Sequence, residues 1–195
     1  REYISSLVRY TKALKNRNAL LVADNQNNLR EKALAWEETL IREGTTVFEK
    51  RERLIQTLSA SAKQIYASLL SANSEERIDL EYSSHFISAD SRASLFERSF
   101  SRDLRRRTTT VGIHRDDISI RFDIGFGLRP VCEIASQKQT RSTALALKLA
   151  GVEYLRSSGE PPIVLLDDVE SELDSERRQK LLDYLVGMTC QILIA

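Results

Sequence analysis

The chain has 195 residues and a mass of 22.2 kDa, which is enough for one large domain or two small ones that each bury a core. Its 29 Lys and Arg nearly balance 28 Asp and Glu, so contact with nucleic acid requires a local basic patch and not a globally basic protein. No apolar run reaches the length of a membrane span and no signal peptide is visible, so we expect no membrane partner and a cytoplasmic location. Cys132 and Cys190 have neither disulfide-framework nor metal-site spacing, and we expect buried, reduced thiols in two strands.

Residues 1–77 predict a helical arm. Apolar residues recur at spacings of three and four in three stretches, a pattern typical of amphipathic helices. These stretches begin near Ile4, Leu29 and Leu54, with breaks at 23–28 and 43–45. Because the breaks are short, we expect three helices that pack as antiparallel neighbours.

Four basic residues gather on the first of these predicted helices: Arg9, Lys12, Lys15 and Arg17. They could form a ridge that binds phosphates, or they could belong to a solvated helix face. The solvated face is the favoured reading.

Residues 78–130 predict a mixed α+β connecting region. Apolar and polar residues alternate from Ile78 to Tyr82 and from Ile118 to Phe122, which indicates two half-exposed strands. Between them a helical pattern ends in the basic residues Arg105, Arg106 and Arg107. These arginines could contact DNA phosphates or could form a solvated helix C-terminus, which the helix dipole favours. After a turn at Gly125 and Gly127, residues 130–134 are expected to return as a strand.

Residues 131–195 carry the strongest motifs. Ser136 to Arg141 lie just before an apolar helical pattern, where a hydroxyl, an amide and free helix N–H groups can meet an anion. Alone, this segment reads as a simple helix cap. Some 30 residues later, Pro161 to Asp174 read PPIVLLDDVESELD, the pattern of a Walker B strand and D-loop of an ATP-binding cassette ATPase. The apolar run from Ile163 predicts a parallel strand buried on both faces.

Adjacent carboxylates follow that strand. Asp167 can hold Mg²⁺ and Asp168 can orient an attacking water. Capping or turn acids after an ordinary core strand are the alternative, which the following Ser171 to Asp174 disfavour.

No Walker A loop of the form G-x-x-x-x-G-K-[ST] accompanies the Walker B pattern. The chain also opens without Met, inside a helical pattern, and stops inside an apolar run. We therefore expect a piece of a longer protein that is inactive by itself, with weak ATPase activity restricted to the complete protein.

Taken together, these motifs resemble the RecF family, bacterial gap-repair proteins related to the Rad50 and SMC ATPases. The matching segments, in the order that the family has them, are 10–21, 112–117, 136–150 and 165–174. The resemblance implies an α/β fold with a helical arm: the C-terminal half of an ABC-type ATPase head, plus an antiparallel helical arm domain. It implies ATP and Mg²⁺ as cofactors, slow hydrolysis, an ATP-dependent homodimer on DNA at gaps and replication forks, a place in the SOS response to DNA damage, and cooperation with RecO and RecR in loading RecA.

The same resemblance suggests roles for individual residues. Those of the signature, which would contact the ATP held by a partner subunit, are Ser136, Lys138 and Gln139. The D-loop residues Ser171 and Asp174 would lie at the dimer interface, with Asp167 on the metal and Asp168 catalytic. His114 is expected to be a structural residue of the Gly-x-His-Arg-Asp-Asp segment and not a general base.

The chain departs from the family pattern at two positions, with Lys138 where Gly is usual and Ile113 where Pro is usual. A lysine could block close approach of the backbone to phosphate or could supply a cation, and we favour obstruction. Two alternative functions stay open: an SMC- or Rad50-like chromosome or nuclease-associated ATPase, and a non-catalytic interaction module with a degenerate nucleotide site.

Overall fold

The structure is a computed structural model that describes residues 1–23, 28–71, 74–87, 91–159, 161–167 and 173–194. The chain separates into two compact units. Unit 1 comprises Arg1–Arg53 and Tyr82–Ile118, and unit 2 comprises Leu54–Glu81 and Ser119–Ala195. Each unit has its own cluster of buried apolar residues.

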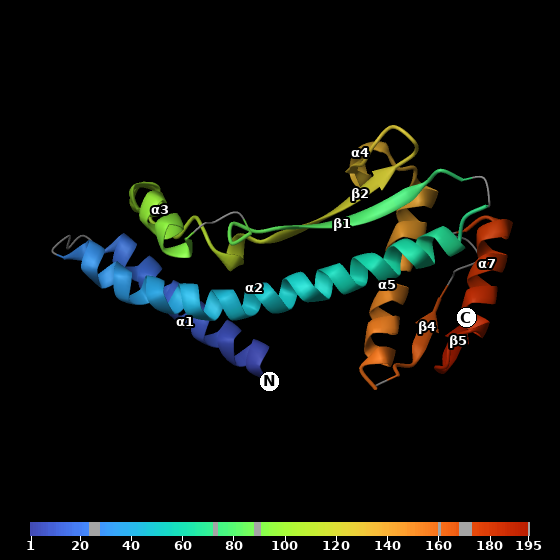
Figure 1. Cartoon of the computed structure of the whole chain (residues 1–195), viewed down its shortest axis with the longest axis horizontal. Coiled ribbons are helices and arrows are strands. Elements are labelled where there is room, and N and C mark those ends of the chain that lie inside the picture. The colour runs from blue at the N-terminus through green and yellow to red at the C-terminus, as the bar shows by residue number, and fades with distance from the viewer. Residues whose placement is uncertain (24–27, 72–73, 88–90, 160, 168–172, 195) are drawn as a thin grey trace. The chain divides into compact units, whose positions relative to one another are not determined.

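The arm region contains two long helices and not the predicted three. Helix α1 spans Glu2–Val22, and helix α2 runs without interruption through the 40 residues Leu29–Ser68 (Figure 1). The expectation of a break at 43–45 was therefore wrong. The antiparallel arrangement of α1 and the first part of α2 is confirmed, because Lys50 pairs with Glu2 while Glu37 pairs with Arg17.

Gly44 explains the missed continuity of α2. A Cβ atom at this position would lie 2.9 Å from Cε2 of Phe86 and 3.2 Å from Cε2 of Tyr10. The glycine is thus required for the close approach of two aromatic rings, and the helix continues through it because packing outweighs a propensity cost of about 1 kcal/mol.

Unit 1 is completed by helix α3, Arg92–Arg106, and by the short 3-10 helix η1, Ile113–Arg115. The predicted helix before the three arginines is confirmed, with Ser91 as its N-cap and Arg107 in the left-handed region at its end. The unit 1 core is built from apolar residues of α1, α2 and α3, from Phe86 in the turn before α3, and from the segment that includes η1: Tyr10, Ala13, Leu40, Val47, Phe48, Phe86, Phe96, Val111 and Ile113.

A three-stranded sheet has the order β1-β2-β3, with β1 at Arg77–Ser83, β2 at Asp117–Asp123 and β3 at Arg129–Pro130. Strands β2 and β3 pair in antiparallel fashion, which confirms the predicted hairpin. The expected strand over 130–134 was wrong, since Val131–Ile134 forms the helical turn α4. Val131 and Ile134 both pack on the unit 2 core, and a spacing of three residues brings two side chains to one side in a helix but not in a strand.

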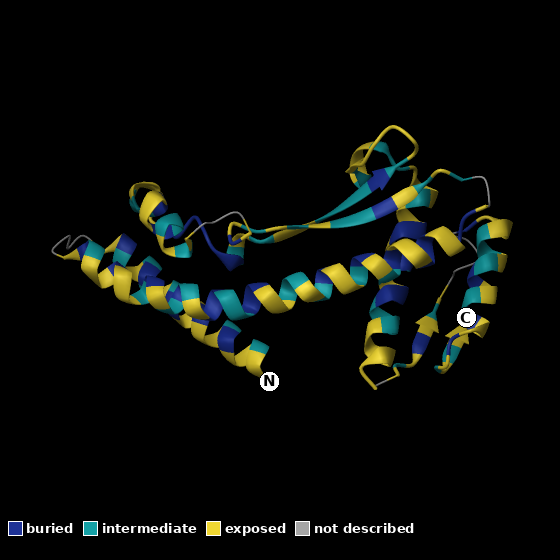
Figure 2. Ribbon diagram, in the orientation of Figure 1, coloured by how far each residue is buried: buried dark blue, intermediate teal, exposed yellow. Residues whose placement is uncertain are grey.

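The C-terminal part of unit 2 consists of helix α5, Gln137–Ser157, strand β4, Val164–Leu166, helix α7, Ser175–Val186, and strand β5, Ile192–Ile194. Strands β4 and β5 pair in parallel, Val164 with Ile192 and Leu166 with Ile194. The buried residues of α5 lie between Ser142 and Ala150, whereas its last turn, 154–157, is exposed (Figure 2). The unit 2 core includes Ala146 and Leu149 of this helix.

Two expectations about burial were wrong. Strand β4 is parallel as predicted, but Ile163 and Leu165 are 62% and 70% exposed while Val164 is 7% exposed. Because successive side chains of a strand point to opposite faces, these values show that the face carrying Val164 is covered and the face carrying Leu165 is open. Cys132 lies exposed in α4, and Cys190 is half-buried just before β5, so neither is a buried strand residue.

Within the part of the chain that the structure describes, no helix has both the length and the apolar character needed to cross a membrane.

Candidate functional site

The start of α5 is fixed by a reciprocal pair of hydrogen bonds. The Ser136 hydroxyl accepts from the backbone N–H of Gln139, and the Gln139 side-chain oxygen accepts from the Ser136 N–H at 2.8 Å. This capping box satisfies two of the free donors at a helix N-terminus. Two of the three residues that the resemblance assigns to a partner's ATP therefore also build the helix start.

Gln139 has a further bond that the sequence did not predict. Its Nε2 atom donates to Oε1 of Glu76 at 2.9 Å, and the Arg177 guanidinium pairs with the same carboxylate at 2.9 Å. The Tyr66 hydroxyl donates to Oε2 of Glu76 at 2.7 Å. Burial first, then the adjacent carboxylate, raises the pKa of Tyr66, which keeps the phenol protonated as a donor.

A pocket of about 300 Å³ lies between helix α5 and strand β4. It is lined by residues from α5, from β4 and from the segments that follow β4: Arg141, Ala144, Leu145, Lys148, Leu165, Leu166, Asp167 and Leu173. The structure thus brings Asp167 and the helix that follows the signature to one cavity, with carboxylate and basic side chains on its walls.

Of the remaining predicted site residues, some are described by the structure and others are not. Asp174 is the N-cap of α7, where its side chain accepts from the Arg177 backbone N–H at 2.9 Å. Lys138 is exposed in the first turn of α5. Asp168 and Ser171 lie outside the described residues, so their roles stay predictions.

Arg141 and Lys148 were missed by the sequence reasoning, although a signal was present. Together with Ala144 and Leu145 they follow the spacing of one helix face, which is the face that lines the pocket. No comparable signal existed for Glu76, which is far from Gln139 and Arg177 in sequence and meets them only in the folded chain.

The arginines at the end of α3 belong to a larger basic surface in unit 1. Arg98, Arg102, Arg105 and Arg106 are exposed and recur at spacings of four, three and one, so they share one side of the helix, and Arg107 follows at its end. Among the described residues, none of these five arginines has an ion-paired carboxylate. We call these five residues the α3 arginine surface.

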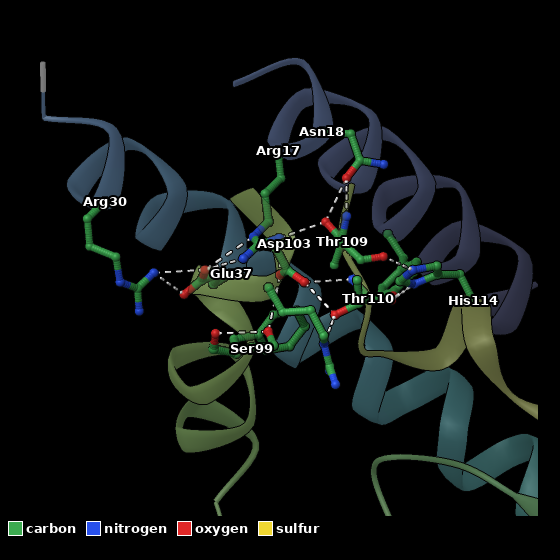
Figure 3. Close-up of polar contacts among 12 residues, drawn as sticks. Arg17, Asn18, Arg30, Glu37, Ser99, Asp103, Thr109, Thr110 and His114 are labelled. Carbon is green, nitrogen blue, oxygen red and sulfur yellow. Dashed lines mark hydrogen bonds and ion pairs between the residues drawn. The ribbon is translucent and has the colours of Figure 1, made fainter. Parts of the chain in front are cut away.

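Arg17 does not belong to a phosphate-binding ridge or to a solvated face. Its side chain is fully buried, and it forms ion pairs with Glu37 at 2.8 Å and with Asp103 at 2.9 Å. A Thr109 hydroxyl oxygen accepts from the same guanidinium at 2.7 Å, and Figure 3 shows these partners converging from α1, α2, α3 and the segment after α3. Burial of a charge requires such partners, which only the tertiary fold supplies.

His114 lies next to this network. Its Nε2–H donates to the Thr109 carbonyl at 3.1 Å, and its Nδ1 accepts from the Tyr10 hydroxyl at 2.8 Å. Burial is the main cause that lowers the pKa of His114. A Cβ atom on Gly112, whose φ is +118°, would lie 2.5 Å from the Tyr10 hydroxyl oxygen, so this glycine is required. These contacts agree with a structural role for His114.

Solved structures give the class of protein. The chain superposes on a structure described as the recombination mediator protein RecF with ATPrS, with a TM-score of 0.75, 28% identity, and coverage of 99% of this chain and 53% of that one. A RecF–ATP structure matches with a TM-score of 0.76 and the same identity and coverage. The fold is that of a partial ABC-type ATPase head with a helical arm, which confirms the predicted fold class.

Sequence relatives give the family. A DNA replication and repair protein RecF from Citrifermentans bemidjiense is 33% identical over 201 residues, covering 98% of this chain and 52% of the relative. RecF from Leptospira interrogans is 35% identical over 185 residues, covering 94% and 48%. No protein-family model matches the chain. The chain belongs to the RecF family and spans about half the length of the curated relatives that it matches.

Proposed function

We propose that the chain is part of a RecF-like protein that binds ATP and DNA and acts in recombinational repair at single-strand gaps and replication forks. In this proposal the complete protein dimerises on ATP, hydrolyses it slowly, and helps RecO and RecR to load RecA. The family relationship supports the general role in DNA replication and repair.

The observation that carries the proposal is the pocket shared by α5 and the end of β4. The carboxylate of Asp167 is of the type that holds Mg²⁺, while Arg141 and Lys148 line the same cavity with cationic side chains suited to phosphate. The residues present therefore fit a magnesium-bound nucleotide. When bound, that group would supply a phosphoryl centre for attack by water, and Asp168 is proposed to orient the water.

The test compares two neighbouring carboxylates in the complete protein that contains this chain. Asp167→Asn should weaken binding of Mg²⁺-ATP, whereas Asp168→Asn should preserve binding and prolong the ATP-bound dimer. Titration calorimetry measures the first effect and analytical ultracentrifugation the second. The control is Asp183→Asn, which removes an exposed carboxylate from α7. Equal loss of nucleotide binding in both site variants would contradict these roles.

For the DNA contact we propose the α3 arginine surface. Unit 1 contains 18 Lys and Arg against 13 Asp and Glu, while unit 2 contains 11 against 15. The near-neutral chain thus has a basic unit and an acidic one. Within the basic unit, the five exposed arginines at α3 match the charge of a phosphate backbone.

Replacing Arg105, Arg106 and Arg107 together by Gln should weaken DNA binding and reduce its salt dependence. Each lost phosphate contact lowers the slope of log K against log salt by about 0.9. Fluorescence anisotropy at several salt concentrations measures both. A control variant removes three exposed lysines of unit 1, Lys12, Lys15 and Lys32. An equal effect in the control would show that binding follows the net charge of unit 1 and not the α3 surface.

A further inference from the structure

We propose that Glu76 is a positioning residue that couples the signature at the start of α5 to the start of α7, and that this coupling sets the strength of ATP-dependent dimerisation. The second part of this inference rests on the proposed function. The sequence motifs assign no role to Glu76 or to its partner Arg177.

One carboxylate connects three elements of unit 2. Oε1 of Glu76 accepts from Nε2 of Gln139 in α5, and both carboxylate oxygens accept from Nη2 of Arg177 in α7, at 3.1 Å and 2.9 Å. The Tyr66 hydroxyl of α2 donates to Oε2. Glu76 itself lies directly before β1.

Arg177 forms the second half of the connection. Its Nη1 donates to the Ser142 hydroxyl oxygen at 3.0 Å, one turn beyond Gln139 on α5. Its backbone N–H donates to the Asp174 side chain that caps α7. The D-loop residue Asp174 and the signature residue Gln139 are therefore connected through Arg177 and Glu76, and Arg177 also contacts α5 directly at Ser142.

Glu76 also decides how the Gln139 amide is oriented. Since Glu76 can only accept a hydrogen bond, the Gln139 Nε2 must point toward it, which leaves the Gln139 oxygen to accept from the Ser136 N–H. The capping box at the signature thus depends on a carboxylate from outside the helix. Without that carboxylate the amide can rotate, and the first turn of α5 loses its fixed geometry.

The connection is partly exposed to solvent. The side chains of Glu76 and Arg177 are 16% and 15% exposed, in contrast to the fully enclosed Arg17 and Asp103. A pair at this depth is held by charge-assisted hydrogen bonds, yet water can solvate its members when it opens. The pair can therefore fix the starts of α5 and α7 relative to each other and still rearrange when a ligand binds to one of them.

The test uses the complete protein that contains this chain. Glu76→Gln keeps an acceptor for Gln139 but removes the charge that Arg177 requires, and Glu76→Ala removes both. We expect weaker ATP-dependent dimerisation, by about tenfold for Glu76→Ala and less for Glu76→Gln, with ATP affinity of the monomer unchanged. Sedimentation measures dimerisation, and calorimetry measures ATP binding under monomeric conditions. The matched control is Glu75→Gln, which alters the adjacent exposed carboxylate.

Hydrogen exchange provides a readout that does not depend on ATP. In Glu76→Gln, amides of 137–140 and of 175–178 should both exchange faster, although only Glu76 was changed. In addition, the loss in the double variant Arg177→Ala with Glu76→Ala should be smaller than the sum of the two single losses, because both changes break the Glu76–Arg177 pair. Additive losses, faster exchange in only one segment, or equal weakening of ATP binding and dimerisation would overturn the inference. If the unmodified protein forms no dimer with ATP, the proposed function fails, and the exchange result still decides the role of Glu76.

Discussion

The two units of this chain each contain an arginine that links several elements through carboxylates, but at different depths. In unit 1, Arg17 and Asp103 are completely enclosed and Glu37 is 4% exposed. In unit 2, Glu76 and Arg177 retain about a sixth of their exposure. An enclosed charge that loses its partner cannot recover hydration, whereas a partly exposed one can. We infer that the unit 1 network fixes the fold, while the unit 2 network can change its partners during function.

The largest expected effect is in unit 1. Asp103→Ala removes the carboxylate that accepts from Arg17, Ser99 and the Thr110 backbone. The substitution leaves the buried guanidinium of Arg17 with one carboxylate fewer. The free energy of unfolding should therefore fall by about 3–5 kcal/mol. Urea unfolding measures the loss, and Glu97→Ala on the exposed side of α3 is the control. A loss below 1 kcal/mol would contradict a structural role for this network.

Removal of the central carboxylate of the unit 2 network should lower the free energy of unfolding by a smaller amount. Glu76→Ala removes charge-assisted hydrogen bonds from groups that water can reach, so we expect a loss of about 1.5–3 kcal/mol in the same unfolding assay. Its main consequence should be the weaker dimerisation described above. If Glu76→Ala destabilises the protein as much as Asp103→Ala does, the distinction between a fixed and an adjustable network fails.

A smaller effect should follow from Asp174→Ala. Asp174 caps α7 with a single backbone hydrogen bond and is exposed, so its removal should lower the free energy of unfolding by about 1 kcal/mol. Asp174→Asn retains the acceptor oxygen and serves as the control. A similar loss with Asn would show that the charge, and not the cap, carries the effect.

The smallest effect concerns pH in unit 1. Burial lowers the pKa of His114, helped by Arg115 and His85, while the Thr109 carbonyl and Asp116 act in the opposite direction. The unfolded chain, with a histidine pKa near 6.5, therefore binds more protons than the folded chain below that pH. The stability contributed by neutral His114 is fully present above pH 6.5 and is lost as the pH falls toward the folded pKa.

Urea unfolding between about pH 7.5 and pH 5, a range that brackets the ordinary histidine pKa, should show this decline in the unmodified protein. The decline should be shallower in His114→Gln. His85→Gln, at an exposed position, should change this decline less than His114→Gln does, because His85 is only a minor cause of the lowered His114 pKa. An unchanged pH dependence in His114→Gln would assign the decline to other groups.

Local patterns predicted the elements well where one physical cause dominated. The alternation around Ile78 and Ile118 predicted both strands, and the pattern after Ser136 predicted the start of α5, while its capping box appeared only in the structure. The pattern failed at Gly44, because a glycine that breaks an isolated helix was needed here for aromatic packing. It failed again at 131–134, where a short apolar run fits a strand or a helical turn and only its neighbours decide.

The candidate site also has parts that the sequence could predict and parts that it could not. Motif order in a known family predicted a metal-binding role for Asp167 and a contact of the signature with a partner's ATP, and only the structure shows Asp167 and α5 on one pocket. The sequence could not predict Glu76 as a partner of Gln139, since 63 residues separate them and no local pattern records a contact across that distance.

By itself, then, the sequence determined the family, the helical and strand periodicities, and the residues with metal-binding or phosphate-binding chemistry. The tertiary structure alone decided which charges are enclosed and which stay accessible. Arg17 and Lys12 are basic residues of the same helix, yet one is buried among carboxylates and the other is exposed. The reason is physical: the cost of enclosing a charge depends on the partners that distant segments bring to it, and those partners exist only once the chain has folded.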